Sequence, residues 1–298
     1  MKKINNYFFS FLLHFSFISN RLSDKTFIKI RYKKCFGKQL NLEDPQTFNE
    51  KLQWLKLYNR KDIFTKMVDK NEAKAYVSSV IGDRYIIPTI GIYNDFEEID
   101  FNKLPNQFVI KCTHDSGGLV IVSDKNKLDI KKARKKINKS LRKNYYYSGR
   151  EWPYKNIKPK IIVEKYMHDN LTDDLRDYKF FCFNGNCKFF KIDFNRATNH
   201  QANYYDIEGN ILPFGEILCP PDFLKHLSLP TNLDKMIKLS EKLSKNIPFL
   251  RVDFYEINGY IFFGELTFYP ASGFGKFIPQ EWDEKLGKLI TLKLADKK

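Results

Sequence analysis

The sequence predicts an α+β protein whose sheets are mainly antiparallel. Hydrophobic residues make up 43% and aromatic residues 16% of the 298 residues, as in folded globular proteins. Short apolar runs joined by turn sequences such as Asn-Gly indicate hairpins, and amphipathic helical segments are mixed among them. Hairpins and helices in one chain favour the α+β class. The chain is long enough for two lobes.

Residues 1–46 are expected to form a basic helix and arm ahead of the main fold. Residues 1–40 hold nine basic residues and one acid, which supplies half of the formal net charge of +16. The apolar run at 7–19 is too short to span a bilayer. It fits either an interfacial helix with basic flanks or an ordinary docked helix. A secretion signal is disfavoured because no small-x-small cleavage site follows the run.

The next elements are helices. Residues 47–58 begin with a capping box, in which Thr47 is the N-cap and Glu50 stands three positions on. A second helix is expected over 61–80. Residues 131–143 form a third helix, with eight basic residues and no acid. Its charged face is either solvated or a docking face for an anionic partner.

The strands are expected mostly in hairpins. Amphipathic spacing places two further helices near the end of the chain, at 233–245 and from about residue 279. No internal repeat or low-complexity linker separates the elements. The apolar runs predict strands within 84–95, 107–113, 119–123, 159–167, 177–183, 187–194, 202–212 and 249–269.

The cysteines are expected to be reduced thiols. Their odd number and the absence of CxxC spacing argue against disulfides and against a zinc site. Cys182 and Cys187 flank the turn-like Asn-Gly-Asn sequence and are expected to be cross-strand neighbours. The five cysteines stand at positions 35, 112, 182, 187 and 219.

The last hairpin carries acids inside both strands. Even-numbered positions are apolar on both strands, whereas Arg251, Asp253 and Glu265 fall on the odd-numbered face. For both apolar faces to share one core, the strands need a three-residue loop at 257–259. Arg251 then lies opposite Glu265, with Asp253 within diagonal reach.

This cluster has two interpretations. Asp253 and Glu265, with the hydroxyl of Thr267 beside them, can hold Mg²⁺ against phosphate oxygens, because magnesium prefers oxygen ligands. Arg251 can then bind a phosphate with its two-pronged guanidinium. Alternatively, Arg251 and Glu265 form an ordinary cross-strand ion pair beside a spare aspartate.

Two upstream segments can also contact a nucleotide. Lys111 lies on a strand just before the loop at 115–118, Asp-Ser-Gly-Gly, whose glycines let backbone amides cradle phosphate. The same loop also makes an ordinary turn. The strand at 161–167 contains Glu164 followed by a lysine and an aromatic residue, a common form of adenine hinge, or else a plain strand.

In this order the motifs resemble the ATP-grasp superfamily, and in detail its TupA-like branch, named for a teichuronopeptide-synthesis protein and found among cell-surface polysaccharide genes. The resemblance covers roughly residues 20–290. It implies a fold of two α+β lobes that hold ATP between them. It also implies a reaction in which ATP phosphorylates a carboxylate and an amine or thiol then attacks the acyl phosphate. It rests on FGKQLNLEDPQTFNEKLQWLKLY, VDKNEAKAYV, FVIKCTHDSGG, GREWPYKNIKPKIIVEKYM, DYKFFCFNG and RVDFY…GELTFYPASGF.

The resemblance also implies roles for single residues. Arg251 would lie beside the transferred phosphate and act with Lys111 in catalysis. Asp253 and Glu265 resemble the magnesium ligands, and Thr267 stands where the superfamily often has asparagine. Lys70 and Lys111 resemble the phosphate-binding lysines. Ser116, Gly117 and Gly118 would form a flap over the phosphates. Glu164 and the backbone of Lys165, Tyr166 and Met167 resemble the adenine hinge, and Asp177 would take the place of the ribose-binding acid.

The implied function is an ATP- and Mg²⁺-dependent carboxylate–amine ligase of surface-polysaccharide synthesis. Its partner would be an acidic glycan or a lipid-linked saccharide precursor, and its location cytoplasmic, with peripheral contact to the anionic inner membrane face as an option. A glycosyltransferase is the alternative, although no convincing Asp-x-Asp motif is present. Charge alone suggests a nucleic-acid binder, but no recognition motif accompanies it. His114, beside the glycine loop, is interpreted as a loop residue rather than the catalytic base.

Overall fold

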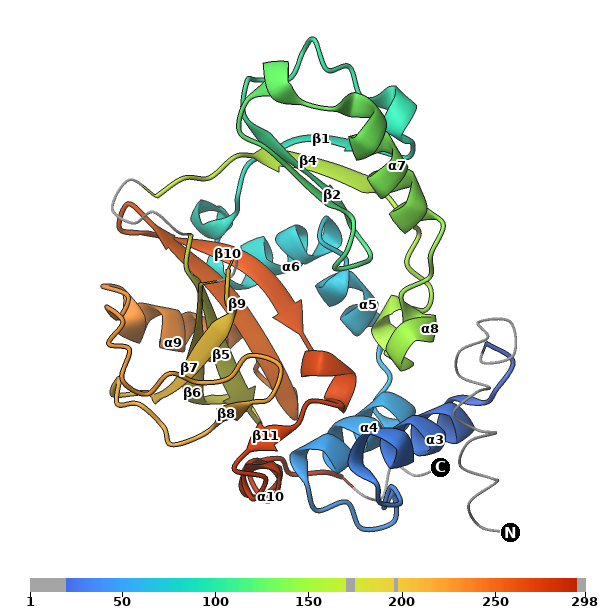
Figure 1. Cartoon of the computed structure of the whole chain (residues 1–298), viewed down its shortest axis with the longest axis vertical. Coiled ribbons are helices and arrows are strands. Elements are labelled where there is room, and N and C mark those ends of the chain that lie inside the picture. Colours follow the sequence, from blue (N-terminus) through green and yellow to red (C-terminus); the bar gives the residue numbers. More distant parts are fainter. Residues whose placement is uncertain (1–19, 170–174, 196–197, 294–298) are drawn as a thin grey trace.

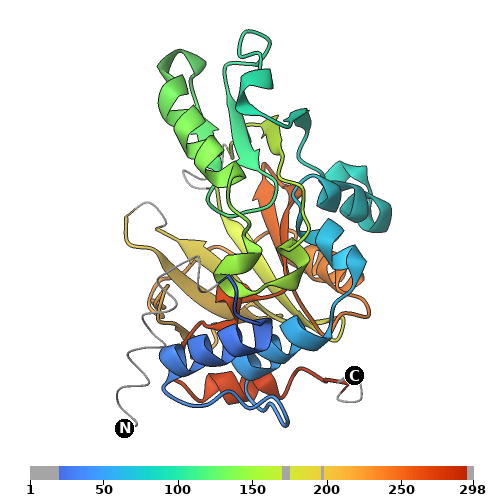
Figure 2. The same cartoon turned by 90° about the vertical axis from the view of Figure 1, so that its right-hand side faces the viewer.

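The computed structural model describes residues 20–169, 175–195 and 198–293, so the apolar run predicted at 7–19 lies outside the described residues. Figures 1 and 2 show a smaller upper part built on a four-stranded sheet and a larger lower part built on a five-stranded sheet. Helices α5 (Asp62–Val68) and α6 (Glu72–Ile81) lie between the two sheets. The prediction of an α+β fold with mainly antiparallel sheets is confirmed.

The smaller sheet has the strand order β1-β4-β2-β3, and each pairing is antiparallel. The predicted basic helix, α7 (Ile130–Leu141), packs its buried Ala133 and Ile137 against Phe108 and Ile110 of this sheet. These residues belong to a hydrophobic core separate from the main one. The strands are β1 (Thr89–Tyr93), β2 (Phe108–Cys112), β3 (Leu119–Val122) and β4 (Ile161–Lys165).

The larger sheet has the strand order β10-β9-β5-β6-β7 and is antiparallel throughout. The β5–β6 hairpin turns at Asn184 and Gly185, whose φ angles of 50° and 83° suit a type I′ turn. Cys182 lies opposite Cys187, as predicted, and both are free thiols. The strands are β5 (Asp177–Phe183), β6 (Asn186–Phe194), β7 (Gln201–Asp206), β9 (Phe249–Ile257) and β10 (Tyr260–Thr267).

Further helices enclose the larger sheet. Helix α4 (Phe48–Tyr58) begins with the predicted capping box: the Thr47 hydroxyl accepts from the Glu50 amide, and the Glu50 carboxylate accepts from the Thr47 amide, both at 3.2 Å. The other elements are α3 (Asp24–Phe36), α8 (Tyr146–Gly149), α9 (Leu233–Leu243), α10 (Trp282–Gly287), the short pair β8 (Gly215–Glu216) and β11 (Phe277–Ile278), and the 3₁₀ turns η1 (Asp83–Tyr85), η2 (Phe96–Glu98), η3 (Lys125–Lys127), η4 (Trp152–Tyr154) and η5 (Pro270–Gly273).

Residues 20–46 contain a packed helix, which corrects the expectation of a connecting arm. Helix α3 begins at the N-cap Ser23 and buries Phe27, Ile28 and Tyr32. These side chains belong to the main hydrophobic core, which also holds the apolar face of the larger sheet. The helix is therefore anchored by burial of its apolar side chains. The domain boundary expected after residue 46 stays a prediction.

The single helix predicted over 61–80 is wrong, because a break at Lys70 separates α5 from α6. Asp69 Oδ1 accepts hydrogen bonds from the amides two and three residues on, each at 2.9 Å, and thereby caps α6. The Lys70 amide donates to the Thr113 carbonyl at 2.9 Å. A local cap and one long-range hydrogen bond thus outweigh helical propensity and place Lys70 where the two parts of the molecule meet.

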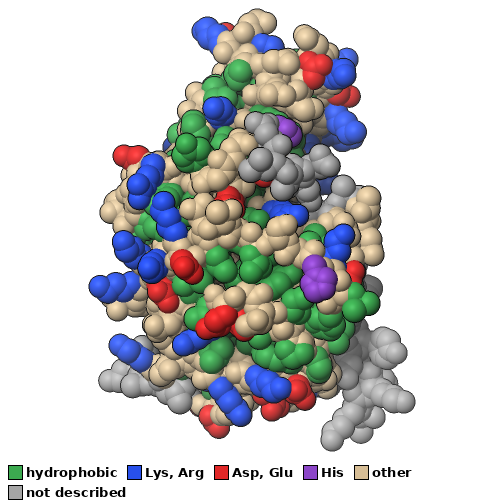
Figure 3. Space-filling view, turned by 90° about the vertical axis from the view of Figure 1, so that its left-hand side faces the viewer, with side chains coloured by type: hydrophobic (Ala, Val, Ile, Leu, Met, Phe, Trp, Pro, Cys, Tyr) green, Lys and Arg blue, Asp and Glu red, His purple; other side chains and the backbone are tan. Residues whose placement is uncertain are grey.

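The surface is mixed in character. Figure 3 shows one face of the molecule, on which hydrophobic side chains gather over the lower half among scattered charged groups. Within the described ranges, no helix combines the length and the apolar character that crossing a bilayer requires.

Candidate active site

The β9–β10 hairpin turns through two residues, not three. Ile257 lies opposite Tyr260, and Asn258 and Gly259 have φ angles of 51° and 78°. This is the type I′ geometry that Asn-Gly favours, since its twist matches the twist of the flanking strands. The predicted three-residue loop is therefore wrong.

A β-bulge at Gly264 nevertheless brings the two acids onto one face. Phe263 follows the register of the turn, whereas Glu265 lies directly opposite Asp253, so Gly264 is an extra residue in its strand. A Cβ atom at Gly264 would come within 3.1 Å of the Asp253 carbonyl oxygen, which explains why glycine suits this position. The predicted convergence of the acids is confirmed, but the extra residue lies in the strand rather than in the loop.

The bulge changes two further expectations. Arg251 lies opposite Thr267 rather than opposite the glutamate. Ile261 and Phe263 are buried in the core, whereas Phe262, which was expected there, lies on the polar face and is half-buried. A single glycine inside a strand pattern is a known signal of a bulge and could have indicated this switch.

Arg251 connects the two acids. Its Nε and Nη2 atoms each donate to Asp253 at 2.7 Å, and Nη2 also donates to Glu265 Oε1 at 2.7 Å. The Thr267 hydroxyl donates to the same Glu265 oxygen at 3.1 Å. Two carboxylates, a guanidinium and a hydroxyl therefore converge on one face of the sheet.

Lys179 extends this cluster beneath the surface. Its Nζ atom lies 3.0 Å from Asp253 and 3.4 Å from Asp193, and it also donates to Asp177, the predicted ribose ligand. All four side chains are at most 8% exposed. Lys191 Nζ lies 3.5 Å from Asp193 and 3.2 Å from Glu216. With Glu216 and Glu265 included, five carboxylates share three cations, Lys179, Lys191 and Arg251, which leaves the cluster with a net formal charge of −2. A divalent cation would balance that charge.

The two facing acids titrate differently. Burial raises the pKa of Asp253 to about 6 despite the nearby Arg251 and Lys179. Desolvation also acts to raise the pKa of Glu265, but Arg251 and Lys179 outweigh it and lower that pKa to about 2; the Glu265 side chain is 47% exposed. An additional cation would favour the ionised form of Asp253. The two carboxylates and the Thr267 oxygen therefore fit a hard divalent cation.

Asp115 fixes the base of the predicted flap. Its carbonyl accepts from Lys70 Nζ, and its carboxylate accepts from the Gly118 amide at 3.0 Å and from the Ser140 hydroxyl. Residues 116–117, at the tip, are exposed. The tip of the loop is thus accessible to a ligand, whereas its base is held by side-chain hydrogen bonds.

Residues from both parts of the molecule line a cavity of about 200 Å³. Burial lowers the pKa of Lys70 there, and Glu265 acts to raise it. Glu151, Tyr145 and Tyr154, which are not among the predicted site residues, also line the cavity. The predicted site residues that line it are Lys70, Ser116, Arg251, Glu265 and Thr267.

Glu151 is a functional candidate that sequence reasoning missed. It is buried, burial raises its pKa, and the Ser272 hydroxyl donates to it at 2.5 Å. The neighbouring Lys56 is fully buried, and burial lowers the pKa of its ammonium group to about 7. A carboxyl group with a raised pKa in a cavity is suited to proton exchange near neutral pH. Its one sequence signal was its place in the GREWPY stretch.

Lys111 and Glu164 form a separate group on the smaller sheet. Lys111 Nζ lies 2.6 Å from one Glu164 oxygen, and Lys74 of α6 contacts the other. Burial acts to raise the pKa of Glu164, but the two lysines lower it. Among the described residues, Lys111, Glu164 and the predicted hinge at 165–167 do not line the 200 Å³ cavity. Lys74 was missed, although it follows Lys70 in the VDKNEAK stretch.

His114 has a structural role at the end of α7. It is buried, and its Nε2 atom lies 3.2 Å from the Ser140 carbonyl and 3.0 Å from the Lys143 carbonyl. Because carbonyl oxygens only accept, this nitrogen carries a proton and donates. The position agrees with the interpretation of His114 as a loop residue rather than a base.

One further group of possible ligands lies beside the cluster. The ligand atoms of Asp193, His200 and Cys219 lie within 4.8 Å of one another, which sequence spacing did not reveal. Lys179 and Lys191 also approach Asp193 within 3.5 Å. We assign no metal to this group, and the expectation of no zinc site stays a prediction.

Residues 50–291 match the family model described as TupA-like ATPgrasp. No curated protein matches the chain.

Several solved structures are similar to the chain. D-alanine–D-alanine ligase from Bacillus anthracis, complexed with ATP, is 18% identical over 67% of this chain and 53% of that chain, with a TM-score of 0.39. Phosphoribosylamine–glycine ligase from Thermotoga maritima is 14% identical over 69% and 48%, with a TM-score of 0.40. D-alanyl-alanine synthetase A from Vibrio cholerae O1 biovar eltor is 10% identical over 78% and 63%, with a TM-score of 0.43. The chain thus spans about half to three fifths of the length of these proteins.

Proposed function

Because this chain belongs to the TupA-like ATP-grasp family, we propose that it is an ATP- and Mg²⁺-dependent ligase that joins a carboxylate to an amine through an acyl phosphate. The observation that carries the proposal is the pair of facing carboxylates, Asp253 and Glu265. Arg251 bridges them, and Glu265 and Arg251 line the cavity together with Lys70 and the flap residue Ser116, whereas Asp253 is buried behind them. Acids, cations and a glycine loop around one space are the groups that phosphoryl transfer requires.

Asp253, Glu265 and the Thr267 hydroxyl would hold the magnesium ion. When bound, Mg²⁺ would supply positive charge that stabilises the transferring phosphoryl group. Arg251, which lies on β9 with Asp253, would bind and orient the same group. Lys70 would contribute a second positive charge from the break between α5 and α6, as a point charge suited to phosphate.

The remaining nucleotide contacts are proposed for the smaller sheet and the cluster. Lys111 would reach the phosphates and Glu164 the adenine edge, with the backbone at 165–167 forming the hinge. Asp177 would bind the ribose. Ser116, Gly117 and Gly118 would close over the phosphates and exclude water, which protects an acyl phosphate from hydrolysis.

We propose Glu151 as the group that accepts the proton of the attacking amine. Its support is a buried carboxyl group in the cavity, with a raised pKa and a hydrogen bond from Ser272. Glu151→Gln should leave ATP binding intact and lower ADP release in the presence of an amine acceptor. Loss of ATP binding in this variant would assign Glu151 to the nucleotide site instead.

The acceptor is proposed to be an acidic glycan or a lipid-linked saccharide precursor of a surface polysaccharide. The formal net charge of +16 supports an acidic partner. A cytoplasmic location with peripheral contact to the anionic inner membrane face is consistent with such an acceptor.

The decisive experiment is calorimetric measurement of ATP binding with and without Mg²⁺. Asp253→Asn and Glu265→Gln should each lose most of the Mg²⁺-dependent affinity, because each removes a carboxylate ligand. Glu281→Gln, which changes an exposed acid near α10, is the matched control and should bind like the wild type. The proposal fails if the wild type binds neither ATP nor ADP, or if both site variants bind normally. Hydrolysis of UDP-sugars without use of ATP would favour the glycosyltransferase alternative.

A further inference from the structure

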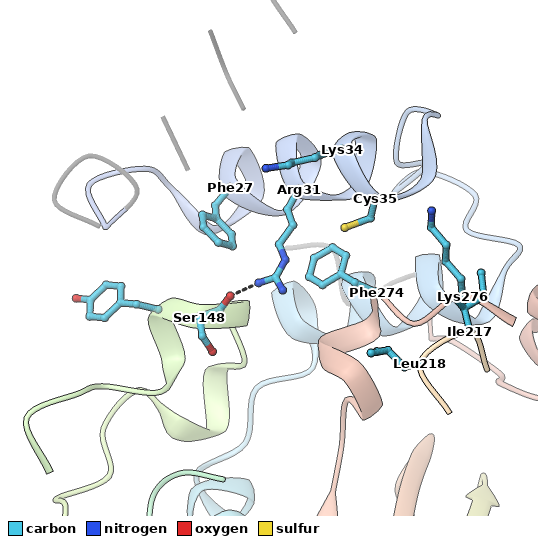
Figure 4. A pocket seen from close by; sticks show the side chains of 10 residues that line it. Phe27, Arg31, Lys34, Cys35, Ser148, Ile217, Leu218, Phe274 and Lys276 are labelled. Atoms are coloured by element: carbon cyan, nitrogen blue, oxygen red, sulfur yellow. Dashed lines mark hydrogen bonds between the residues drawn. The ribbon is translucent and has the colours of Figure 1, made fainter. Parts of the chain in front are cut away.

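A larger hollow of about 580 Å³ lies beside α3 (Figure 4). Its walls come from α3, α8, the connection after β8 and the segment after η5. The aromatic rings of Phe27 and Phe274 supply apolar wall. Arg31, Lys34 and Lys276 also line the hollow, whereas no acid from the described part of the chain does. The hollow is therefore both apolar and positively charged.

The three cations that line the hollow come from two elements, α3 and the segment after η5. The guanidinium of Arg31 lies 4.4 Å above the ring of Phe274 and donates to the Ser148 carbonyl. Lys34 follows one helical turn along α3, and Lys276 comes from the segment after η5; both side chains are exposed (Figure 4). One fixed guanidinium and two exposed ammonium groups around aromatic rings suit an anionic group that is attached to an apolar body.

The rim of the hollow carries strongly exposed apolar side chains. Ile217 is 55% and Leu218 75% exposed, and Phe223 and Leu224, further along the same connection, are 46% and 89% exposed. The Ile217 amide donates to the Lys276 carbonyl at 2.9 Å, which ties the rim to the basic wall. Large apolar side chains that are exposed side by side, as Ile217 and Leu218 are at the hollow, mark contact surfaces.

We propose that the hollow and residues 217–224, together called the docking surface, bind an anionic lipid bilayer. Leu218 and Leu224 enter the boundary of the acyl chains, while Arg31 and the two lysines bind lipid phosphate groups. A soluble anion would occupy the cations but leave the exposed leucines without a partner. A bilayer accounts for both the cations and the exposed leucines.

The docking surface adjoins the candidate active site. Tyr145 and Ser272 line the 200 Å³ cavity, and Tyr147 and Phe274, two residues on in each segment, line the hollow. A lipid-linked acceptor held at the membrane would therefore arrive next to the nucleotide site. This inference deepens the peripheral placement proposed above and rests on it for its role. Vesicle binding is measured without ATP, however, so the lipid proposal and the ligase proposal can fail separately.

The test is co-sedimentation of the full chain with phosphatidylcholine vesicles, prepared with and without phosphatidylglycerol. The wild type should prefer the vesicles that contain phosphatidylglycerol and lose affinity as salt rises. Lys34→Ala combined with Lys276→Ala should weaken binding roughly 25-fold, because each basic residue near an anionic surface changes affinity about fivefold. Leu218→Ser combined with Leu224→Ser should weaken binding about tenfold or more, since apolar insertion is lost.

Lys131→Ala combined with Lys135→Ala is the matched control, because it removes the same charge from the basic helix α7. This control should bind vesicles like the wild type, and thermal midpoints equal to that of the wild type show that the variants are folded. The inference is overturned if the control variant of α7 weakens vesicle binding as much as Lys34→Ala combined with Lys276→Ala does. It is also overturned if the leucine variant binds like the wild type, or if the wild type shows no preference for phosphatidylglycerol.

Discussion

Replacement of Lys179 by methionine tests the charge balance beneath the candidate metal site. The ammonium group is buried, 3.0 Å from Asp253 and 3.4 Å from Asp193, and it also contacts Asp177. Methionine keeps a long apolar stem and removes the charge. The variant therefore leaves three buried carboxylates without the cation they share.

The expected cost follows from this geometry. Removal of one partner from a buried ion pair costs about 3–5 kcal/mol. At about 2 °C per kcal/mol for a chain of this size, the thermal midpoint should fall by about 6–10 °C near neutral pH. The loss is larger than that of an exposed lysine, because no water can replace the ammonium group.

The loss of stability in Lys179→Met, relative to the wild type, should become smaller as the pH falls. Burial already raises the pKa of Asp253 to about 6, and the loss of Lys179 raises it further. Between the unfolded-state pKa of about 4 and this raised value, the folded variant binds protons that the unfolded chain does not, so its stability rises as pH falls. Between about pH 7.5 and 5.5 the deficit relative to the wild type should decrease by roughly 1–2 kcal/mol.

The assay is thermal and urea unfolding of the wild type and the variant at both pH values. Lys188→Met, an exposed lysine of β6, is the matched control and should change stability by less than about 0.5 kcal/mol. The reasoning is refuted if Lys179→Met is no more destabilising than this control, or if its deficit is the same at both pH values.

Three further predictions follow from single contacts. Thr47→Ala should lower the free energy of unfolding by about 1 kcal/mol in urea titrations, because the capping box of α4 loses its hydroxyl acceptor; an unchanged midpoint would contradict this. Gly264→Val should destabilise the fold by roughly 1–3 kcal/mol and weaken Mg²⁺-dependent ATP binding, since its Cβ would lie 3.1 Å from the Asp253 carbonyl; a variant as stable as the wild type would argue against the bulge. Lys70→Met should weaken ATP binding in calorimetry by about tenfold or more, as expected for a charged hydrogen bond, and unchanged affinity would remove Lys70 from the site.

Local patterns predicted much of the fold. The capping box at Thr47 and Glu50 correctly marked the start of α4, because an N-cap depends only on residues three positions apart. The flanking positions of Cys182 and Cys187 correctly predicted cross-strand neighbours. The motif order also correctly indicated the family that the model for residues 50–291 describes.

The candidate site was predicted only in part. Strand parity placed Asp253 and Glu265 on one face but located the extra residue in the loop rather than at Gly264. An extra residue in the loop and an extra residue in the strand both place the two acids on one face, so the alternation of side chains could not distinguish them. The helical pattern over 61–80 likewise concealed the break at Lys70, because the hydrogen bond to Thr113 depends on a distant strand.

The sequence by itself determined the types of element, the helix cap and the set of charged residues available to a site. Only the tertiary structure decided which of these charges meet. Lys179 gains Asp253 and Asp193 as partners because β5 lies between β9 and β6, and Glu151 reaches the cavity because a loop packs against Ser272. Such contacts depend on which strands and loops become neighbours in the fold, and the local periodicity of the sequence does not predict this.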